Sequence, residues 1–189
     1  MLSVPAPAPG CAAVLLGGSR SLPASAAPWV SRVVSAVVGA GLGVSVGCAV
    51  GADQLVLSAC PPSSLRVFAA FGPGGQGAWR CSAVSAVVAA AASGVPVAWW
   101  AGGGASVPLV GRLFCRSVAA LAGCIAAVFF APGPGSLAVA GAAVAASVPV
   151  FAVCRLAPPC PRGCVGAWVS GSFLGLACWF WSPAQQRLF

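Results

Sequence analysis

Lysine, glutamate, histidine, asparagine, threonine and tyrosine are all missing from the 189 residues of this chain, and Asp53 is its only acidic residue. Without histidine, a serine or cysteine nucleophile lacks its usual base, and a single carboxylate cannot form an acid–base pair. The same shortage leaves no His/Asp/Glu set for a catalytic metal. The composition therefore argues against most kinds of enzyme, although a substrate-assisted reaction or one with Asp53 as a lone base stays open.

The missing residue types share a coding property and not a physical one. Lysine, glutamate, histidine, asparagine, tyrosine and threonine all need adenine at the first or second codon position, and so does isoleucine, which occurs only at Ile125. Only Asp53 and four glutamines break the second-position rule. We therefore predict a gene depleted in adenine on its sense strand, which the coding sequence would test. Under this hypothesis the 60% hydrophobic content and the mean hydropathy of +1.01 partly reflect nucleotide bias.

What the chain does carry is positive charge, since nine arginines against one aspartate give a formal net charge of +8. Every basic side chain is therefore a guanidinium, which suits planar, bidentate contacts with phosphate or carboxylate. This balance favours an anionic partner, and the alternative is that arginine merely supplies solubility. The chain has ten cysteines, and most of them lie within apolar runs, which favours buried free thiols over disulfides. The sequence also does not start with a basic and apolar signal segment, so we expect a reducing, cytoplasmic location.

The length predicts one domain with a substantial core, and the pattern along it is typical of an α/β fold. Short Val/Phe/Leu-rich runs alternate with Gly-rich punctuation and longer Ala-rich stretches. We expect strands at 12–16, 44–46, 65–71, 95–100, 124–130 and 148–153. We expect helices at 28–39, 53–60, 78–93, 107–123 and 136–147. The alternation predicts a doubly wound, mostly parallel Rossmann-like sheet with helices on both faces.

Composition also divides the chain into three parts. Residues 1–10 form a Pro/Ala-rich lead-in that we expect to be disordered, 11–156 form the Rossmann-like domain, and 157–189 form a Cys/Pro/Trp-rich appendage. Within the appendage, residues 163–181 are uncharged, which allows a packed segment or, alternatively, a membrane span or anchor. A membrane protein without ligand chemistry is the alternative for the whole chain, because 117–154 is also uncharged.

A zinc site in the appendage is a further alternative. Cys160 and Cys164 lie four residues apart, and Cys154 and Cys178 are near them in the sequence. Structural zinc sites usually have two close cysteine pairs, and no second close pair exists here. We therefore predict neither a metal nor a cofactor.

Four glycine-containing loops directly follow predicted strands, at 17–20, 47–53, 101–104 and 132–136. Glycine lets backbone amides approach a ligand closely, and the following helix N-terminus presents unpaired N–H groups to an anion. Parallel sheets bind ligands beyond the carboxyl ends of their strands, so these loops would share one edge. The set predicts a phosphate cradle, although each loop alone also fits an ordinary tight turn.

The order of these motifs resembles the Rossmann-like SLOG superfamily, which includes the DNA-processing protein A (Smf) domain and the "lonely guy" phosphoribohydrolases. The resemblance covers about 11–154 and rests on Gly18-Ser19-Arg20, the 47–53 loop, 112–117 and 135–140. The Gly-Ser-Leu at 135–137 with its Ala-rich helix looks most like the DNA-processing branch. The phosphoribohydrolase branch needs a glutamate that this chain lacks, so that activity is not expected. The resemblance implies non-catalytic binding of a nucleotide, a nucleotide-derived signal or single-stranded DNA.

The predicted ligand-binding residues line the glycine loops and one helix. They are Gly17, Gly18, Ser19, Arg20, Gly47, Cys48, Gly51, Asp53, Arg112, Arg116, Gly133, Gly135 and Ser136. The expected partner is a nucleotide or a single-stranded nucleic acid. Homo-oligomerisation is left open, and no membrane contact is expected outside residues 163–181. Trp99 and Trp100 could stack on a base, or belong to the core.

Three of these residues have competing interpretations. Arg112 and Arg116 are spaced i, i+4, so both side chains project from the same face of a helix. That face is either a clamp for an anion or an ordinary face exposed to solvent. Asp53 could accept hydrogen bonds from ligand hydroxyls, hold Arg20 or Ser19 in place, or simply favour the start of a helix.

Overall fold

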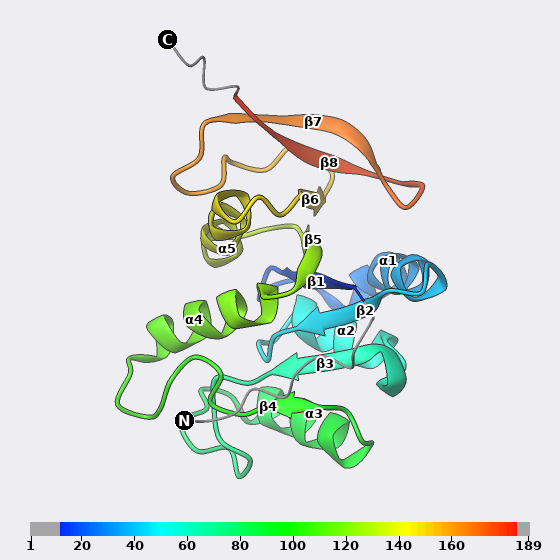
Figure 1. Ribbon diagram of the computed structural model, residues 1–189. Helices are drawn as coiled ribbons and strands as arrows, with labels where there is room; N and C mark the ends of the chain where they lie inside the picture. The colour runs from blue at the N-terminus through cyan, green and yellow to red at the C-terminus, as the bar shows by residue number, and fades with distance from the viewer. Residues whose placement is uncertain (1–11, 185–189) are drawn as a thin grey trace.

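The computed structural model describes residues 12–184, which form one eight-stranded sheet covered by helices on both faces (Figure 1). The strands lie in the order β4-β3-β2-β1-β5-β6-β8-β7. The strands are β1 (Ala13–Gly18), β2 (Gly43–Val46), β3 (Leu65–Phe68), β4 (Val97–Ala98), β5 (Cys124–Phe130), β6 (Val150–Val153), β7 (Gly166–Phe173) and β8 (Leu176–Pro183). The first six are parallel, as predicted, and the last two are antiparallel.

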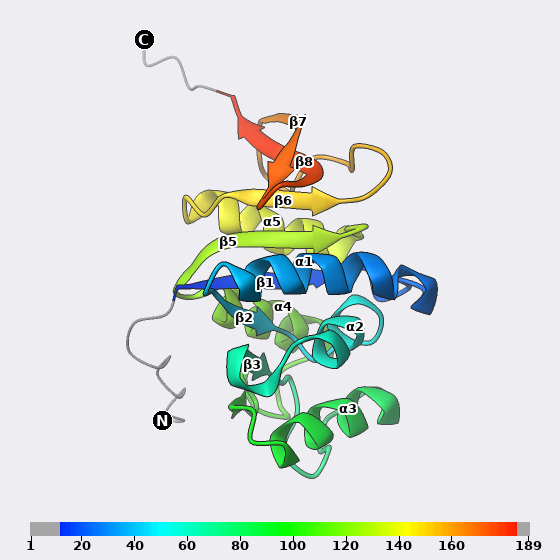
Figure 2. The same ribbon diagram turned by 90° about the vertical axis from the view of Figure 1, so that its right-hand side faces the viewer.

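Five α-helices connect the parallel strands, and all five were predicted. They are α1 (Ala27–Gly39), α2 (Ala52–Ala59), α3 (Cys81–Ala92), α4 (Leu109–Leu121) and α5 (Pro134–Ala145). Figure 2 shows α1, α2 and α3 on one face of the sheet and α4 and α5 on the other. The prediction of a doubly wound, mostly parallel sheet is therefore confirmed.

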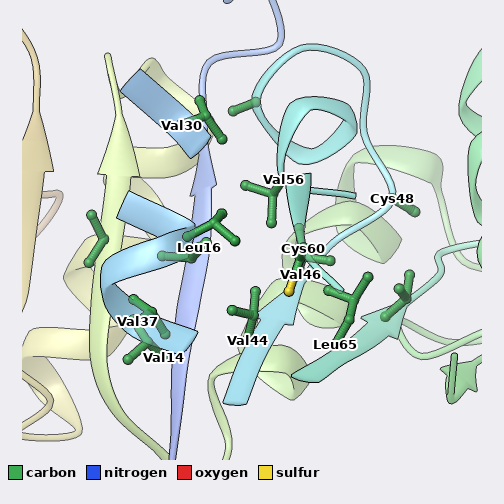
Figure 3. Packing of buried hydrophobic residues seen from close by; sticks show 14 of the residues in the cluster. Val14, Leu16, Val30, Val37, Val44, Val46, Cys48, Val56, Cys60 and Leu65 are labelled. Atoms are coloured by element: carbon green, nitrogen blue, oxygen red, sulfur yellow. The ribbon is translucent and has the colours of Figure 1, made fainter. Parts of the chain in front are cut away.

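Strand residues alternate between two hydrophobic clusters because successive side chains of a strand point to opposite faces. Val14 and Leu16 of β1 pack with Val30 and Val37 of α1 in one cluster (Figure 3). Leu15 lies in the other cluster, on the α4 and α5 face. Both faces of the central strands are buried, which is why these strands read as continuous apolar runs.

The strands next to the sheet edge are shorter than predicted. β3 ends at Phe68 and β4 contains only Val97–Ala98. Trp100 follows β4 with a φ of 55°, which turns the chain out of the strand conformation. The residues after β3 form a Gly-rich loop that reaches α3 at Cys81.

The C-terminal region forms a hairpin that the sequence pattern did not predict. β7 and β8 are joined at Leu174 and Gly175, whose φ values of 49° and 78° are both positive, as in the tight hairpin turns that match strand twist. β8 also pairs with β6, so the hairpin continues the main sheet. Residues 163–181 are therefore mostly strand, and none of the helices within 12–184 is long and apolar enough to cross a membrane.

The division of the chain at residue 156 stays a prediction, and the lead-in predicted over 1–10 lies outside the described residues.

Candidate nucleic-acid interface

The candidate site lies at the carboxyl ends of β1, β2 and β5. β1 connects through α1 to β2 on one side, while β5 pairs with β1 on the other side. The strand order thus reverses at β1, and doubly wound sheets bind ligands in the crevice that this reversal creates. Three of the predicted loops, at 17–20, 47–53 and 132–136, meet at this edge.

The first loop is joined to the loop after β5 by hydrogen bonds. The Ser19 amide donates to the Phe130 carbonyl at 2.9 Å, and the Ser136 hydroxyl donates to the Gly18 carbonyl at 2.9 Å. A side chain at position 18 would collide with the backbone of Phe130, so glycine is required there by close approach. At Gly133, at the start of α5, a Cβ would have open space around it. The two loops are therefore packed against each other at β1, while the α5 terminus stays open.

The second loop is held against the first. Gly51 has a φ of 76°, and a Cβ there would collide with the carbonyl groups of Ser19 and Arg20. The next residue, Ala52, donates its amide to the Ser19 carbonyl at 3.0 Å. The start of α2 is consequently fixed beside the Gly-Ser-Arg motif, as the shared-edge prediction required.

Asp53 forms a buried ion pair that the sequence did not reveal. Its Oδ2 accepts hydrogen bonds from the Ala49 amide at 2.9 Å and from Nη2 of Arg116 at 3.0 Å, and both side chains of the ion pair are more than 90% buried. A Cβ at Gly47 would overlap the Arg116 guanidinium. Asp53 does not hold Arg20 or Ser19, as one interpretation had it; its carboxylate connects α2 to α4.

Electrostatics keep this arginine charged inside the protein. Burial works against the charged guanidinium of Arg116, but the carboxylate of Asp53 outweighs it, so the pKa of Arg116 lies above its ordinary value. Cys48 is itself buried and accepts a hydrogen bond from the Ala70 amide at 3.2 Å. Burial raises the pKa of the Cys48 thiol, and the charge of Arg116 offsets only part of that rise. The thiol is therefore a packing group here.

Arg112 is also turned inward from α4. It donates to the carbonyls of Ala70 at 2.9 Å and Gly77 at 3.0 Å, and its guanidinium lies 5.3 Å from the centre of the Trp100 ring. The interpretation of Arg112 and Arg116 as a solvated face is wrong, because both are buried. Their i, i+4 spacing does place both guanidinium groups under the loops of this edge, where they bind the protein's own carbonyl and carboxylate groups.

Two exposed arginines at this edge lie beside Trp79, a residue that was not among the ligand-binding residues predicted from the sequence. Its side chain is 55% exposed, and the guanidinium groups of Arg20 and Arg80 lie 5.2 and 5.0 Å from the centre of its ring. We call these three residues the Trp79 cluster. The signal for it in the sequence is an aromatic residue beside an arginine after a Gly-rich stretch, whereas Trp99 and Trp100 were the tryptophans predicted to stack on a base.

Those two tryptophans are engaged within the protein. Trp99 packs against Phe71, with ring centres 6.1 Å apart, and Trp100 lies beside Arg112. The cavity next to the Trp79 cluster is small, about 30 Å³, and its lining includes Cys48, Ala70 and Leu113. Any ligand at this edge would therefore lie on the surface more than inside it.

Metal ligands do not gather anywhere in residues 12–184, where no three cysteine or aspartate side chains lie close enough to hold an ion. The nine cysteines of this part of the chain are free thiols. The fourth predicted loop, at 101–104, packs on α4, since a Cβ at Gly102 would collide with the Arg112 backbone.

The fold is that of a Rossmann-like α/β protein with its loops gathered at the switch point of the sheet. Two solved structures match it: DNA processing protein A from Helicobacter pylori, with a TM-score of 0.63 and 14% identity, and DNA processing protein A from Streptococcus pneumoniae, with a TM-score of 0.56 and 17% identity. The chain thus has a DNA-processing-protein-A-like fold.

Both matches cover 77% of this chain, but it spans only 66% of the Helicobacter protein and 51% of the Streptococcus protein. The Helicobacter protein binds single-stranded DNA. No protein-family model and no curated protein matches the sequence.

Proposed function

We propose that this chain binds single-stranded DNA, without catalysis, across the carboxyl edge of β1, β2 and β5. The observation that carries the proposal is the Trp79 cluster, in which an exposed aromatic ring has two guanidinium groups close to it. Proteins that bind single strands combine stacking of bases on aromatic rings with basic groups that follow the phosphates. The likeness of the fold to a protein that binds single-stranded DNA supports the same partner.

The charge at this edge is suited to a polyanion. Arg20 and Arg80 are exposed, whereas the only acidic side chain of the chain, Asp53, is buried and paired with Arg116. The N-terminus of α5 at Pro134 adds the positive end of a helix dipole to the same edge. Phosphate groups would therefore meet positive charge without a competing carboxylate side chain.

A small nucleotide at this edge is the second candidate ligand, and the size of the cavity there argues against it. Pockets for small molecules usually enclose about 300–1,000 Å³. The cavity beside the Trp79 cluster has about 30 Å³, too little to enclose a base and sugar. A strand that lies along the surface needs no such enclosure.

Fluorescence anisotropy with a labelled oligothymidylate and a labelled adenine nucleotide tests the proposal. Two phosphate contacts, from Arg20 and Arg80, predict a slope of about −1.4 for the logarithm of the binding constant against the logarithm of salt concentration, since single strands give about −0.7 per contact. Arg20→Ala should reduce the slope by about half. Arg32→Ala, which removes an exposed arginine on α1, is the matched control and should change it little.

The stacking part is tested separately by Trp79→Ala. Loss of one stacked base costs about 1–3 kcal/mol, which corresponds to roughly 5- to 150-fold weaker binding. Circular dichroism should show the fold unchanged, because the side chain is largely exposed. Unaltered DNA affinity in Trp79→Ala would rule out the Trp79 cluster as the site, and tight, salt-insensitive binding of the adenine nucleotide would favour the second candidate.

A further inference from the structure

β7 leaves one complete row of backbone groups unpaired among residues 12–184. It pairs with β8 in an uninterrupted antiparallel register from Gly166↔Pro183 to Phe173↔Leu176, and β8 pairs with β6 on its other side. The Ala184 amide donates to the Val165 carbonyl at 2.9 Å, which identifies that position as a hydrogen-bonded pair.

Hydrogen-bonded and non-hydrogen-bonded pairs alternate along an antiparallel ladder. Counting from Val165, the residues whose amides and carbonyls point away from β8 are Gly166, Trp168, Ser170 and Ser172. Proline at position 183, opposite Gly166, agrees with this assignment because it has no amide to donate. Four consecutive outward positions thus form an open hydrogen-bonding edge.

Nothing in the sequence of this edge prevents another strand from pairing with it. Proteins usually protect an edge strand with charged residues, proline or a bulge. β7 contains no charged residue and no proline, its register with β8 has no shift, and residues 163–184 as a whole are uncharged. The side chain at Val169 is 48% exposed in the middle of the strand.

We propose that β7 pairs with β7 of a second copy of this chain, antiparallel and around a two-fold axis at Val169. In this register Gly166 lies opposite Ser172 of the other copy, and Trp168 lies opposite Ser170. If the two-fold axis passed through Trp168 or Ser170 instead, at least one of the four residues whose backbone groups point outward would have no partner in β7 of the other copy. The centre at Val169 engages all four, so the edge is complementary to itself.

The side chains and charges also favour a second copy as the partner. Val169 lies opposite Phe180 of β8, and Phe180 packs on Phe151 of β6 with ring centres 5.4 Å apart. Pairing at Val169 would continue this apolar row into the other copy, because side chains of non-hydrogen-bonded neighbours approach closely. Each chain carries a net charge of +8, and the uncharged hairpin is a surface where two copies can meet without opposing arginines.

Light scattering coupled to size exclusion should give twice the chain mass of 18.3 kDa across a concentration series. Val169→Cys fixes the register, because its Cα would lie about 4.5 Å from that of its own mate, near the range that disulfides require. Mild oxidation with copper phenanthroline should cross-link two copies through position 169, as peptide mapping by mass spectrometry would show. Ala167→Cys is the control, since its two copies would lie roughly 13 Å apart.

Ser170→Pro tests the backbone contact itself. The amide at position 170 points away from β8, so proline should remove the contact between copies and leave the hairpin intact. Ser170→Ala keeps the amide and should stay dimeric. The expected result is a monomer for Ser170→Pro with an unchanged circular dichroism spectrum.

Two results would overturn the proposal. One is a monomeric wild-type protein at every concentration. The other is a dimer in which Val169→Cys does not cross-link through position 169. The cross-link decides the question even if Ser170→Pro fails to fold.

Discussion

Asp53→Asn is expected to lower the free energy of unfolding by about 3–5 kcal/mol, because removal of one partner leaves the other charge buried and unpaired. Asparagine keeps the size of the side chain and an oxygen that can still accept the Ala49 amide, which lies 2.9 Å from Oδ2. The substitution therefore removes mainly the charge. Native domains have about 5–15 kcal/mol of stability, so the loss would be a large share of the total.

The partner of Asp53 gives the second half of the test. Arg116→Met fills much of the same space without charge and leaves the carboxylate of Asp53 buried, so it should cost a similar amount. In the double variant no charge is buried, and we expect it to be more stable than either single variant. Arg32→Met, which removes an exposed arginine on α1, should change stability by less than about 0.5 kcal/mol.

Urea unfolding followed by tryptophan fluorescence measures all four variants on one scale. Coupling between two contacting residues appears as a departure from additivity of about 0.5–3 kcal/mol. If the double variant loses the sum of the two single losses, the ion pair does not couple α2 to α4 and the reasoning is refuted.

Two other positions give independent outcomes. Gly47→Ala should destabilise the protein strongly, because a methyl group there would overlap the Arg116 guanidinium; Gly104→Ala, with nothing within 4 Å, is the control in the same urea experiment. Alkylation mapped by mass spectrometry should label the exposed Cys81 at pH 8 but spare Cys60, because burial raises the pKa of Cys60 to about 11. Labelling of Cys60 should increase as the pH rises toward that value, and equal rates for both thiols at pH 8 would contradict its burial.

Periodicity predicted the parallel part of the fold well, because buried strands and Ala-rich helices differ in length and in the residues between them. It missed the hairpin because β7 and β8 have no alternation of polar and apolar residues. Trp168 and Trp181 pack edge-to-face with ring centres 5.3 Å apart, yet their neighbours on the exposed face are also apolar. In a chain so poor in polar residues, the period of two that marks a half-exposed strand is hidden.

The same poverty of polar residues explains the error about α4. Charged residues usually mark the solvent face of a helix. Here the exposed stripe is apolar, with Val110, Phe114 and Val118 between 37 and 81% exposed, while both arginines point inward. The inward face is stable because each guanidinium meets an oxygen that the fold supplies. Those oxygens come from elements distant in sequence, so spacing within the helix could not reveal them.

The presence of a single acid now has a structural reason. Arg112 is buried against the backbone carbonyls of Ala70 and Gly77, whereas the only hydrogen-bond partner of the Arg116 guanidinium within residues 12–184 is the carboxylate of Asp53. The packing of α4 holds Arg116 at Gly47, so its buried charge depends on that one carboxylate at the start of α2. Once Asp53 is committed there, no acidic side chain remains to neutralise Arg20 or Arg80. The pairing that stabilises the interior is thus also what leaves the positive charge of the Trp79 cluster unopposed. Binding of a phosphate backbone and the integrity of the ion pair are therefore separable. Asp53→Asn should lower the free energy of unfolding. In the folded fraction, the slope of the logarithm of the DNA-binding constant against the logarithm of salt concentration should stay at the value for two exposed arginines.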